Sequence, residues 1–285
     1  MIRVTAIISA LFALTLSAFG QIKVDLRLNK KDYLHGEAIL ADITISNFTA
    51  SDLEFQGTKS KPWLDFIVSS GRGVPMSPAR RPAFGVTSIP SGKSVSKTID
   101  LTRLYAFSEL GNFSIYAVVR EHGAERRDGY QSKRHLFNIA KAAPYWTKAY
   151  GHDGRAQEYR LIHFNSQPRN QFYAQIVDKD TGSVLRTHLL GDIIMVRKPT
   201  AALDGALNMH VLFMVNPSFW AHVRVAPSGE IIGRELYRPG SSGSPRLAMT
   251  NDGVIQVVGG SYYDAAKEAA ERDTVRKASD RPDIR

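Results

Sequence analysis

The chain has 285 residues and a formal net charge of +10, with 43% hydrophobic and 22% charged residues. This is the composition of a globular protein, and the chain is long enough for two domains. It contains no cysteine, which excludes disulfide bonds, thiolate chemistry and zinc–thiolate sites.

The first 20 residues have the pattern of a secretory signal peptide. Arg3 gives a positive start, residues 4–16 are mostly apolar, and residues 18–20 read Ala-Phe-Gly, which is a cleavage-site pattern. The apolar stretch is shorter than the ~20 residues of a spanning helix, which disfavours the alternative of an uncleaved anchor. We therefore expect a periplasmic or extracellular protein that begins near Gln21 and has no transmembrane span after cleavage.

The basic residues are scattered along the sequence and do not form one run. They either solvate the surface or meet anionic envelope polymers or lipid head groups, and an exported protein meets these more readily than it meets nucleic acid. We therefore expect no nucleic-acid partner.

Residues 22–140 predict about seven short strands with turn signals between them. Apolar and polar residues alternate at 22–29, 39–46 and 113–120, which places one face of each strand on a core. Ile43 and Ile115 are expected in that core. Further strands are expected at 53–55, 63–68, 95–101 and 136–139. This pattern is typical of an immunoglobulin-like β-sandwich.

Two resemblances support this fold. Residues 109–115, Glu-Leu-Gly-Asn-Phe-Ser-Ile, resemble the start of strand F in immunoglobulin domains, with Phe113 at the position of the corner tyrosine and Ile115 at that of the cysteine. Residues 30–102 resemble bacterial immunoglobulin-like domains of the Bacillus intracellular proteinase-inhibitor type. The resembling segments are Asn47-Phe-Thr49, Trp63-Leu-Asp-Phe-Ile-Val68 with Gly71-Arg-Gly73, and Pro90-Ser-Gly92. This second resemblance implies the fold and leaves protease inhibition as one alternative function.

Residues 141–150 are expected to form a linker, because Pro144 stops strand pairing. The following region, residues 151–264, contains an internal repeat. Residues 172–185 align without gaps with residues 219–232, and Asp-Gly pairs recur at Asp153, Asp204 and Asp252. A unit of about 50 residues with several strands is similar to a β-propeller blade, and the region holds two full units and part of a third.

Such a region is too short to close a propeller ring, since propellers usually have about four to eight blades. The units either pack as a small sandwich or barrel, which we favour, or join a second copy of the chain to complete a ring, or form an open stack. Residues 265–285 are rich in helix formers but have almost no apolar face. They predict a charged tail that is partly helical and partly disordered.

No motif carries a recognisable catalytic, metal or cofactor site; we expect no cofactor and no metal, and we favour a non-enzymatic role while an enzyme stays an alternative. Residues 178–183 resemble a truncated calcium loop but lack its later ligands, so they are interpreted as a turn. Residues 240–244 resemble a nucleophile elbow without its strand-turn-helix context. His163, His210 and His222 can converge if they lie on alternating strands, although surface or hydrogen-bonded histidines are the commoner outcome.

Aromatic side chains are the candidate ligand-binding residues, because sugar-binding surfaces use exposed rings as platforms, although packing between sheets uses them equally well. The candidates are Trp146, Tyr150, Tyr173, Trp220, Tyr262 and Tyr263. We expect an exported, non-enzymatic binding or structural protein of the cell envelope that meets a protein or a glycan. The alternatives are a protease inhibitor, and a hydrolase or carbohydrate-binding hydrolase accessory whose site is assembled from distant residues.

Overall fold

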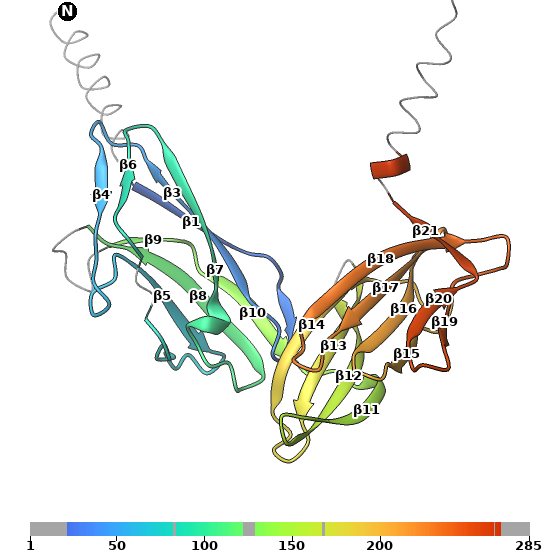
Figure 1. The fold of residues 1–285 in the computed structure, drawn as a ribbon. Coiled ribbons are helices and arrows are strands. Elements are labelled where there is room, and N and C mark those ends of the chain that lie inside the picture. Colours follow the sequence, from blue (N-terminus) through green and yellow to red (C-terminus); the bar gives the residue numbers. More distant parts are fainter. Residues whose placement is uncertain (1–21, 82–83, 122–128, 167–168, 265, 269–285) are drawn as a thin grey trace, which may run out of the picture. The chain divides into compact units, whose positions relative to one another are not determined.

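The computed structural model describes residues 22–81, 84–121, 129–166, 169–264 and 266–268 (Figure 1). These residues form an all-β protein, apart from the 3-10 helix η2 (Leu101–Arg103) and three helical residues at 266–268. None of the described helical residues belongs to a segment with the length and hydropathy of a transmembrane helix. The predicted signal peptide and most of the predicted tail lie outside the described residues.

The chain divides into two compact units between Lys141 and Ala142. In the described part of the first unit, two larger sheets and one small sheet are present. The first sheet has the order β1-β3-β7 and consists of β1 (Ile22–Leu28), β3 (Leu40–Asn47) and β7 (Ser94–Asp100). The second has the order β2-β10-β8-β5 and consists of β2 (Asp32–Leu34), β10 (His135–Ala140), β8 (Gly111–Val119) and β5 (Leu64–Ser70), with β9 (Tyr130–Gln131) beside β8. The small sheet pairs β4 (Leu53–Phe55) with β6 (Thr87–Ile89).

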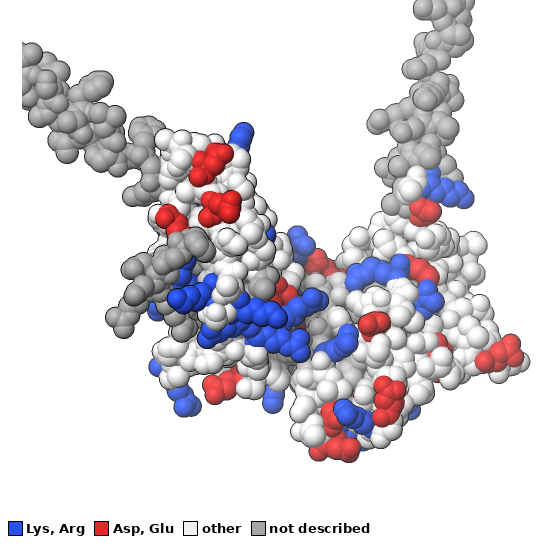
Figure 2. All heavy atoms as spheres, turned by 60° about the vertical axis from the view of Figure 1, so that its left-hand side comes forward, with Lys and Arg blue, Asp and Glu red and all other residues white. Residues whose placement is uncertain are grey.

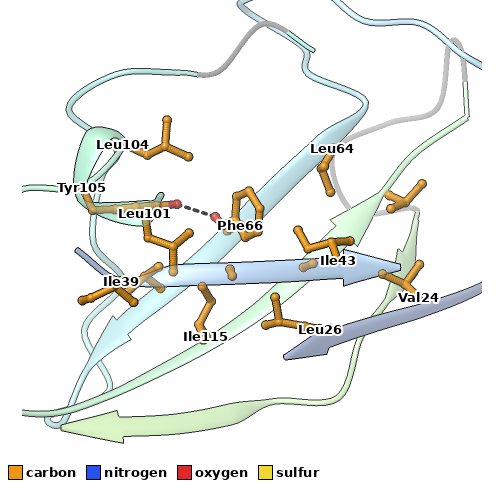
Figure 3. Close-up of a cluster of buried hydrophobic side chains, with 14 of the residues drawn as sticks. Val24, Leu26, Ile39, Ile43, Leu64, Phe66, Leu101, Leu104, Tyr105 and Ile115 are labelled. Carbon is orange, nitrogen blue, oxygen red and sulfur yellow. Dashed lines mark hydrogen bonds between the residues drawn. The ribbon is translucent and has the colours of Figure 1, made fainter. Parts of the chain in front are cut away.

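One hydrophobic core joins the two larger sheets, because alternate residues of their strands point to the same side. Figure 3 shows Val24 and Leu26 of β1, Ile43 of β3 and Ile115 of β8 converging in it. Ile43 is 1% exposed and Ile115 is 0% exposed, so the prediction that both are buried is confirmed. The alternating sequence patterns therefore identified the inward faces of these strands.

The second unit is a propeller-like arrangement of small antiparallel sheets that follow one another along the chain (Figure 1). The first sheet contains, in chain order, β11 (Pro144–His152), β12 (Arg155–Ser166), β13 (Arg169–Asp178) and β14 (Val184–Asp192). The second contains β15 (Thr200–Leu203), β16 (Met209–Asn216), β17 (Phe219–Val225) and β18 (Ile231–Pro239), with β21 (Gly260–Tyr263) beside β18. The third pairs β19 (Arg246–Met249) with β20 (Ile255–Val258).

The predicted repeat is present in this unit as two four-stranded meanders followed by a two-stranded hairpin. Each Asp-Gly pair lies in the turn that joins the first and second strands of its sheet, at Asp153, Asp204 and Asp252. Gly182 and Gly229 occupy the equivalent turns after β13 and β17, with φ of +70° and +89°. Glycine tolerates this left-handed conformation because it has no Cβ. The repeat therefore reflects equivalent turns as well as equivalent strands.

The aligned strands β13 and β17 turn equivalent small residues toward the same layer. Ala174 and Ala221 are both buried in one core cluster, as the alignment predicts. Phe172 and Phe219 differ, however, because Phe172 is fully buried whereas Phe219 is partly exposed and packs on Tyr263. The alignment makes Phe172 and Phe219 equivalent and so predicts that their rings lie at matching depth; this prediction is wrong. A register shift next to Phe219 places this residue at the end of its sheet.

The linker predicted at residues 141–150 is also wrong, since most of it belongs to β11. Pro144 begins this strand, and β11 forms the edge of the order β11-β12-β13-β14. Proline is compatible with the first position of an edge strand, because its missing N–H group is not required by a neighbour there. The passage between the units is accordingly shorter than the sequence indicated.

Candidate functional site

The first unit contains a cavity of ≈ 520 Å³ beside β5, which is an edge strand of its sheet. This volume is within the range of about 300–1,000 Å³ that is usual for ligand pockets. The cavity is lined by the loop before β5, by the start of β5, by residues 75–81, by Tyr105 and by residues 120–121, which follow β8. Segments far apart in the sequence therefore meet at one edge of the sheet.

Apolar side chains form most of the lining. Trp63 directly precedes β5 and Phe66 lies in it, and Met76 and Pro78 come from the loop that follows it. Trp63 and Phe66 also belong to the hydrophobic core, so that one wall of the cavity is continuous with the core. The Tyr105 hydroxyl group donates a hydrogen bond of 2.5 Å to the Phe66 carbonyl oxygen, which Figure 3 marks with a dashed line. This wall is thus held both by packing and by a buried hydrogen bond.

The loop after β5 explains why the cavity lies where it does. The loop returns along β5, where the Met76 N–H group donates to the Val68 carbonyl oxygen at 2.8 Å and the Ser70 N–H group donates to the Val74 carbonyl oxygen at 2.9 Å. These bonds cover the outer edge of the second half of β5. Residues 64–67 pair with β8 on one side, and on the other side they face no further strand among the described residues. The cavity occupies this open part of the edge.

Charged side chains accompany the apolar lining. They are the cations Lys61, Arg81 and Arg120 and the acids Asp65 and Glu121. Arg120 is buried, with its guanidinium group 3.5 Å from the Asp65 carboxylate, whereas Lys61 and Arg81 are exposed. Figure 2 shows Lys and Arg side chains gathered in a band on the first unit, although they are scattered in the sequence. The cavity therefore combines apolar walls with a small excess of cations.

Three of the six predicted ligand-binding aromatic residues are buried in the second unit. Tyr150 stacks on Tyr159 with ring centroids 4.2 Å apart, and its hydroxyl group donates to Gln157 Oε1 at 2.8 Å. Tyr173 and Trp220 are buried as well. In the structure these three rings pack against other protein side chains and do not form an exposed platform.

The other three candidates are more accessible. Trp146 is partly buried against the core of the second unit, and Tyr263 lies under the Arg238 guanidinium group at 4.3 Å from its ring centroid. Tyr262 is 62% exposed and meets the Tyr237 ring edge-on. Among the described residues, no ring-to-ring contact joins two of the six candidates. The structure therefore does not bring them together into one platform.

Two of the three histidines that could converge are in contact. His210 of β16 and His222 of β17 are 5% and 4% exposed, and their facing nitrogen atoms are 3.0 Å apart. His163 lies on β12, in the sheet formed by β11 to β14, and is not part of this pair. Carboxylates extend the pair at both ends, with Asp204 3.2 Å from His210 and Glu235 3.3 Å from His222. The second unit thus contains a row of four titratable side chains, in which the two histidines are buried and the two carboxylates are partly exposed.

The protonation of this row is shaped by burial and hydrogen bonding. Burial lowers the pKa of His222, because the charged imidazolium is poorly solvated there. Burial opposes ionisation of Asp204 and Glu235, but hydrogen bonds from Asn208 and from Tyr237, respectively, outweigh it and lower the pKa of both carboxyl groups. Both carboxylates are therefore ionised near neutral pH.

Residues 178–183, which resemble a calcium loop, form a turn, as the sequence predicted. The Asp178 carboxylate accepts hydrogen bonds from the N–H groups of Asp180 and Thr181, at 3.0 and 2.9 Å. These bonds lower the pKa of Asp178, and the bond from Thr181 contributes most. Residues 240–244 form the turn between β18 and β19 and have no helix after them. Within the part of the chain that the structure describes, no group of three His, Asp or Glu residues is arranged to hold a metal ion.

Comparisons with known proteins add little to this geometry. No protein-family model matches the chain, and no curated protein matches it. Among solved structures, it is similar to Spo0M, a sporulation control protein from Bacillus subtilis, at 12% sequence identity and a TM-score of 0.30. That match covers 91% of this chain and 98% of the other.

Proposed function

We propose that this protein is an exported, non-enzymatic binding protein of the cell envelope, and that its first unit is an immunoglobulin-like domain. In this proposal the cavity beside β5 takes an extended, apolar segment of a partner protein. The observation that carries the proposal is the position of an apolar cavity along the open part of a sheet edge. The Phe66 carbonyl oxygen at this edge already accepts from the Tyr105 hydroxyl group, so the segment is held mainly by its side chains in the apolar lining.

Two features support an immunoglobulin-like domain. Two sheets share one core, and the inward residues of β1, β3 and β8 alternate as in that fold. The corner tyrosine of immunoglobulin domains is replaced by Phe113, which stacks on Phe137 with ring centroids 5.4 Å apart. Packing then takes the place of the missing hydroxyl hydrogen bond at that corner.

The lining favours a protein segment over a glycan. Sugars need exposed ring faces and many polar groups, whereas Trp63 is 1% exposed and its ring stacks on Phe55. Met76 is a flexible apolar side chain and Pro78 a rigid one, and both suit contact with the side chains of a peptide. Lys61 and Arg81, which are exposed at the cavity, favour a segment that carries an acidic residue.

The experiment selects peptides from a displayed library on the purified mature protein and measures their affinity by titration. Met76→Arg places a charged side chain at the cavity and should weaken binding at least about tenfold, which corresponds to about 1.4 kcal/mol. Leu136→Arg is the matched control, because Leu136 is 71% exposed and lies outside the lining. Thermal melting of each variant verifies that it is folded.

Lys61→Glu tests the charge preference without a change in the core, since Lys61 is exposed. It should weaken acidic peptides and leave neutral ones nearly unchanged. Selected peptides that bind Met76→Arg and wild type equally well would show that the cavity is not the site, and a library that yields no binder would count against a peptide ligand.

A further inference from the structure

A row of four side chains crosses the second sheet of the second unit. It runs from Asp204, in the turn after β15, through His210 of β16 and His222 of β17 to Glu235 of β18. The Asp204 Oδ2 atom is 3.2 Å from His210 Nε2, His210 Nδ1 is 3.0 Å from His222 Nε2, and His222 Nδ1 is 3.3 Å from Glu235 Oε2. All four ring nitrogens of the two histidines are therefore engaged in three contacts.

Counting protons shows what this row requires. A contact between an imidazole nitrogen and a carboxylate is a hydrogen bond only if the nitrogen carries a proton, and a contact between two nitrogens needs one proton between them. The three contacts together need three protons. Two neutral imidazoles carry only two, so one contact then joins two acceptors. Two imidazolium ions carry four, which places two N–H groups against each other at the 3.0 Å contact. Only the pair with one added proton satisfies every contact.

The charged groups around the pair are compatible with one positive charge. On the same sheet, Arg224 lies 3.3 Å from Glu235, and the Tyr237 hydroxyl group donates to Glu235 at 2.9 Å. From the neighbouring hairpin, Leu247 of β19 and Val257 of β20 pack on this face of the sheet. Further titratable or charged residues on the surrounding elements are Arg197, which lies over Trp220, Arg246, Asp252 and Tyr262. One imidazolium and Arg224 thus balance the Asp204 and Glu235 carboxylates.

We propose that His210 and His222 form a proton-binding site that takes up one shared proton on mild acidification and thereby links the Asp204 turn to β18. Before this uptake each ring carries one proton and one of the three contacts is broken; burial disfavours the charged form of His222. Acidification supplies the missing proton and closes the row.

The Asp204 end of this site lies next to the hydrogen bond that attaches the β19–β20 hairpin to the turn after β15. The Gly205 N–H group, next to Asp204, donates a hydrogen bond of 3.1 Å to the Gly253 carbonyl oxygen in the turn of that hairpin. Asp204 also accepts hydrogen bonds from Ala206 and Asn208, at 2.9 and 2.8 Å, so its carboxylate shapes the turn. The shared proton fixes the position of Asp204, and the attachment of the hairpin becomes sensitive to external pH.

The test is a pH titration of the full-length mature protein, labelled with ¹⁵N in its histidine rings and followed by NMR. The two rings should titrate together, with a combined uptake of one proton below the ordinary histidine pKa of about 6.5. In His222→Gln, the shared one-proton step of the two rings should be lost. The matched control is His152→Gln on β11, which should leave the titration of the pair unchanged.

Two results would overturn the proposal. In one, the wild-type rings each take up a full proton in independent steps, or neither ring takes up a proton before the protein unfolds in acid. In the other, the apo protein shows no shared titration but binds one equivalent of Zn²⁺ tightly, which would make the four side chains a metal site. The wild-type titration decides the matter even if His222→Gln does not fold.

Discussion

The Tyr105 hydroxyl group donates a buried hydrogen bond to the Phe66 carbonyl oxygen, across 39 residues of chain. Phe66 lies on the edge strand β5, and Tyr105 follows the 3-10 helix η2. Tyr105 supplies a donor to the sheet edge where no further strand is present in the described chain. The same bond holds the wall of the cavity that we propose as the peptide site.

Replacing Tyr105 by Phe should therefore destabilise the first unit. The Phe66 carbonyl oxygen would lose its donor while remaining buried, which costs about 1–3 kcal/mol of unfolding free energy. Urea denaturation measures this change. Tyr116→Phe, at a partly exposed residue of β8, is the control and should change the unfolding free energy by less than about 0.5 kcal/mol. Equal effects of the two substitutions would show that the Tyr105 bond is not formed.

Ile43→Asp should unfold the first unit, because it places an unpaired carboxylate in the core between the two sheets. The expected loss is about 3 kcal/mol or more, which is a large part of the stability of a typical domain. Circular dichroism melting measures it, with Leu136→Asp at a 71% exposed position as the control. A cooperative Ile43→Asp variant with an unchanged midpoint would contradict the described core.

Gly229→Ala should destabilise the second unit more than Gly182→Ala does. Both glycines have positive φ, and an alanine in this conformation costs about 1 kcal/mol at either position. At Gly229 the added Cβ would also lie 2.8 Å from Ile176 Cδ1 and 2.9 Å from Arg186 Cδ, whereas at Gly182 no atom is within 4 Å. Chemical denaturation of the two variants compares them directly, and a larger effect at Gly182 would contradict the turn geometry.

The stability of the second unit should fall as pH falls below about 6.5. In the unfolded chain both His210 and His222 bind a proton with an ordinary pKa, whereas the folded pair has room for one, and burial lowers the pKa of His222. The unfolded state therefore binds more protons, and the slope is up to about 1.4 kcal/mol per pH unit for each such proton. The lowered pKa values of Asp204 and Glu235 act in the same direction, but only in the lower pH range where carboxylates titrate.

Denaturation at several pH values measures this dependence. The double variant His210→Gln with His222→Gln should have a shallower slope between about pH 6.5 and pH 5. An unchanged slope in the double variant would assign the pH dependence to other groups.

Export remains a prediction from the sequence. The mature chain isolated from its native host should begin near Gln21, because residues 18–20 form the cleavage-site pattern. Mass spectrometry of the fractionated host measures this. A cytoplasmic protein that retains Met1 would refute both the export and the envelope role.

The sequence predicted those features of the fold that depend on local patterns. Alternation at residues 22–29 and 113–120 identified the inward faces of β1 and β8, because a strand must bury one side. The recurring Asp-Gly pairs marked the first turn of each sheet in the second unit. The linker prediction was wrong because proline is compatible with the start of an edge strand as well as with a break in strand pairing. The sequence of β11 does not by itself show that this strand lies at the edge of its sheet.

The candidate sites depend on contacts between distant segments, which local patterns do not report. The cavity lies where Trp63, Met76 and Tyr105 meet, and the return of the loop along β5 brings them together. The histidine pair depends on the register of β16 and β17. Leu212 lies directly opposite His222, so His210, two residues before Leu212, is the diagonal neighbour of His222 on the same face. A slip of one residue would turn one ring to the opposite face. The spacing of the histidines therefore allowed the contact without predicting it.

The two-stranded sheet formed by β19 and β20 has a consequence for the motions of the second unit. Its strands pair only with each other in the described chain, and it is held by side chains such as Leu247 and Val257 and by the hydrogen bond from Gly205 to Gly253. Segments with few such restraints open locally, well before the whole domain unfolds. The backbone amides of this hairpin should therefore exchange with solvent deuterium sooner than those of the buried strands β16 and β17, so that the unit loosens from its two-stranded end inward.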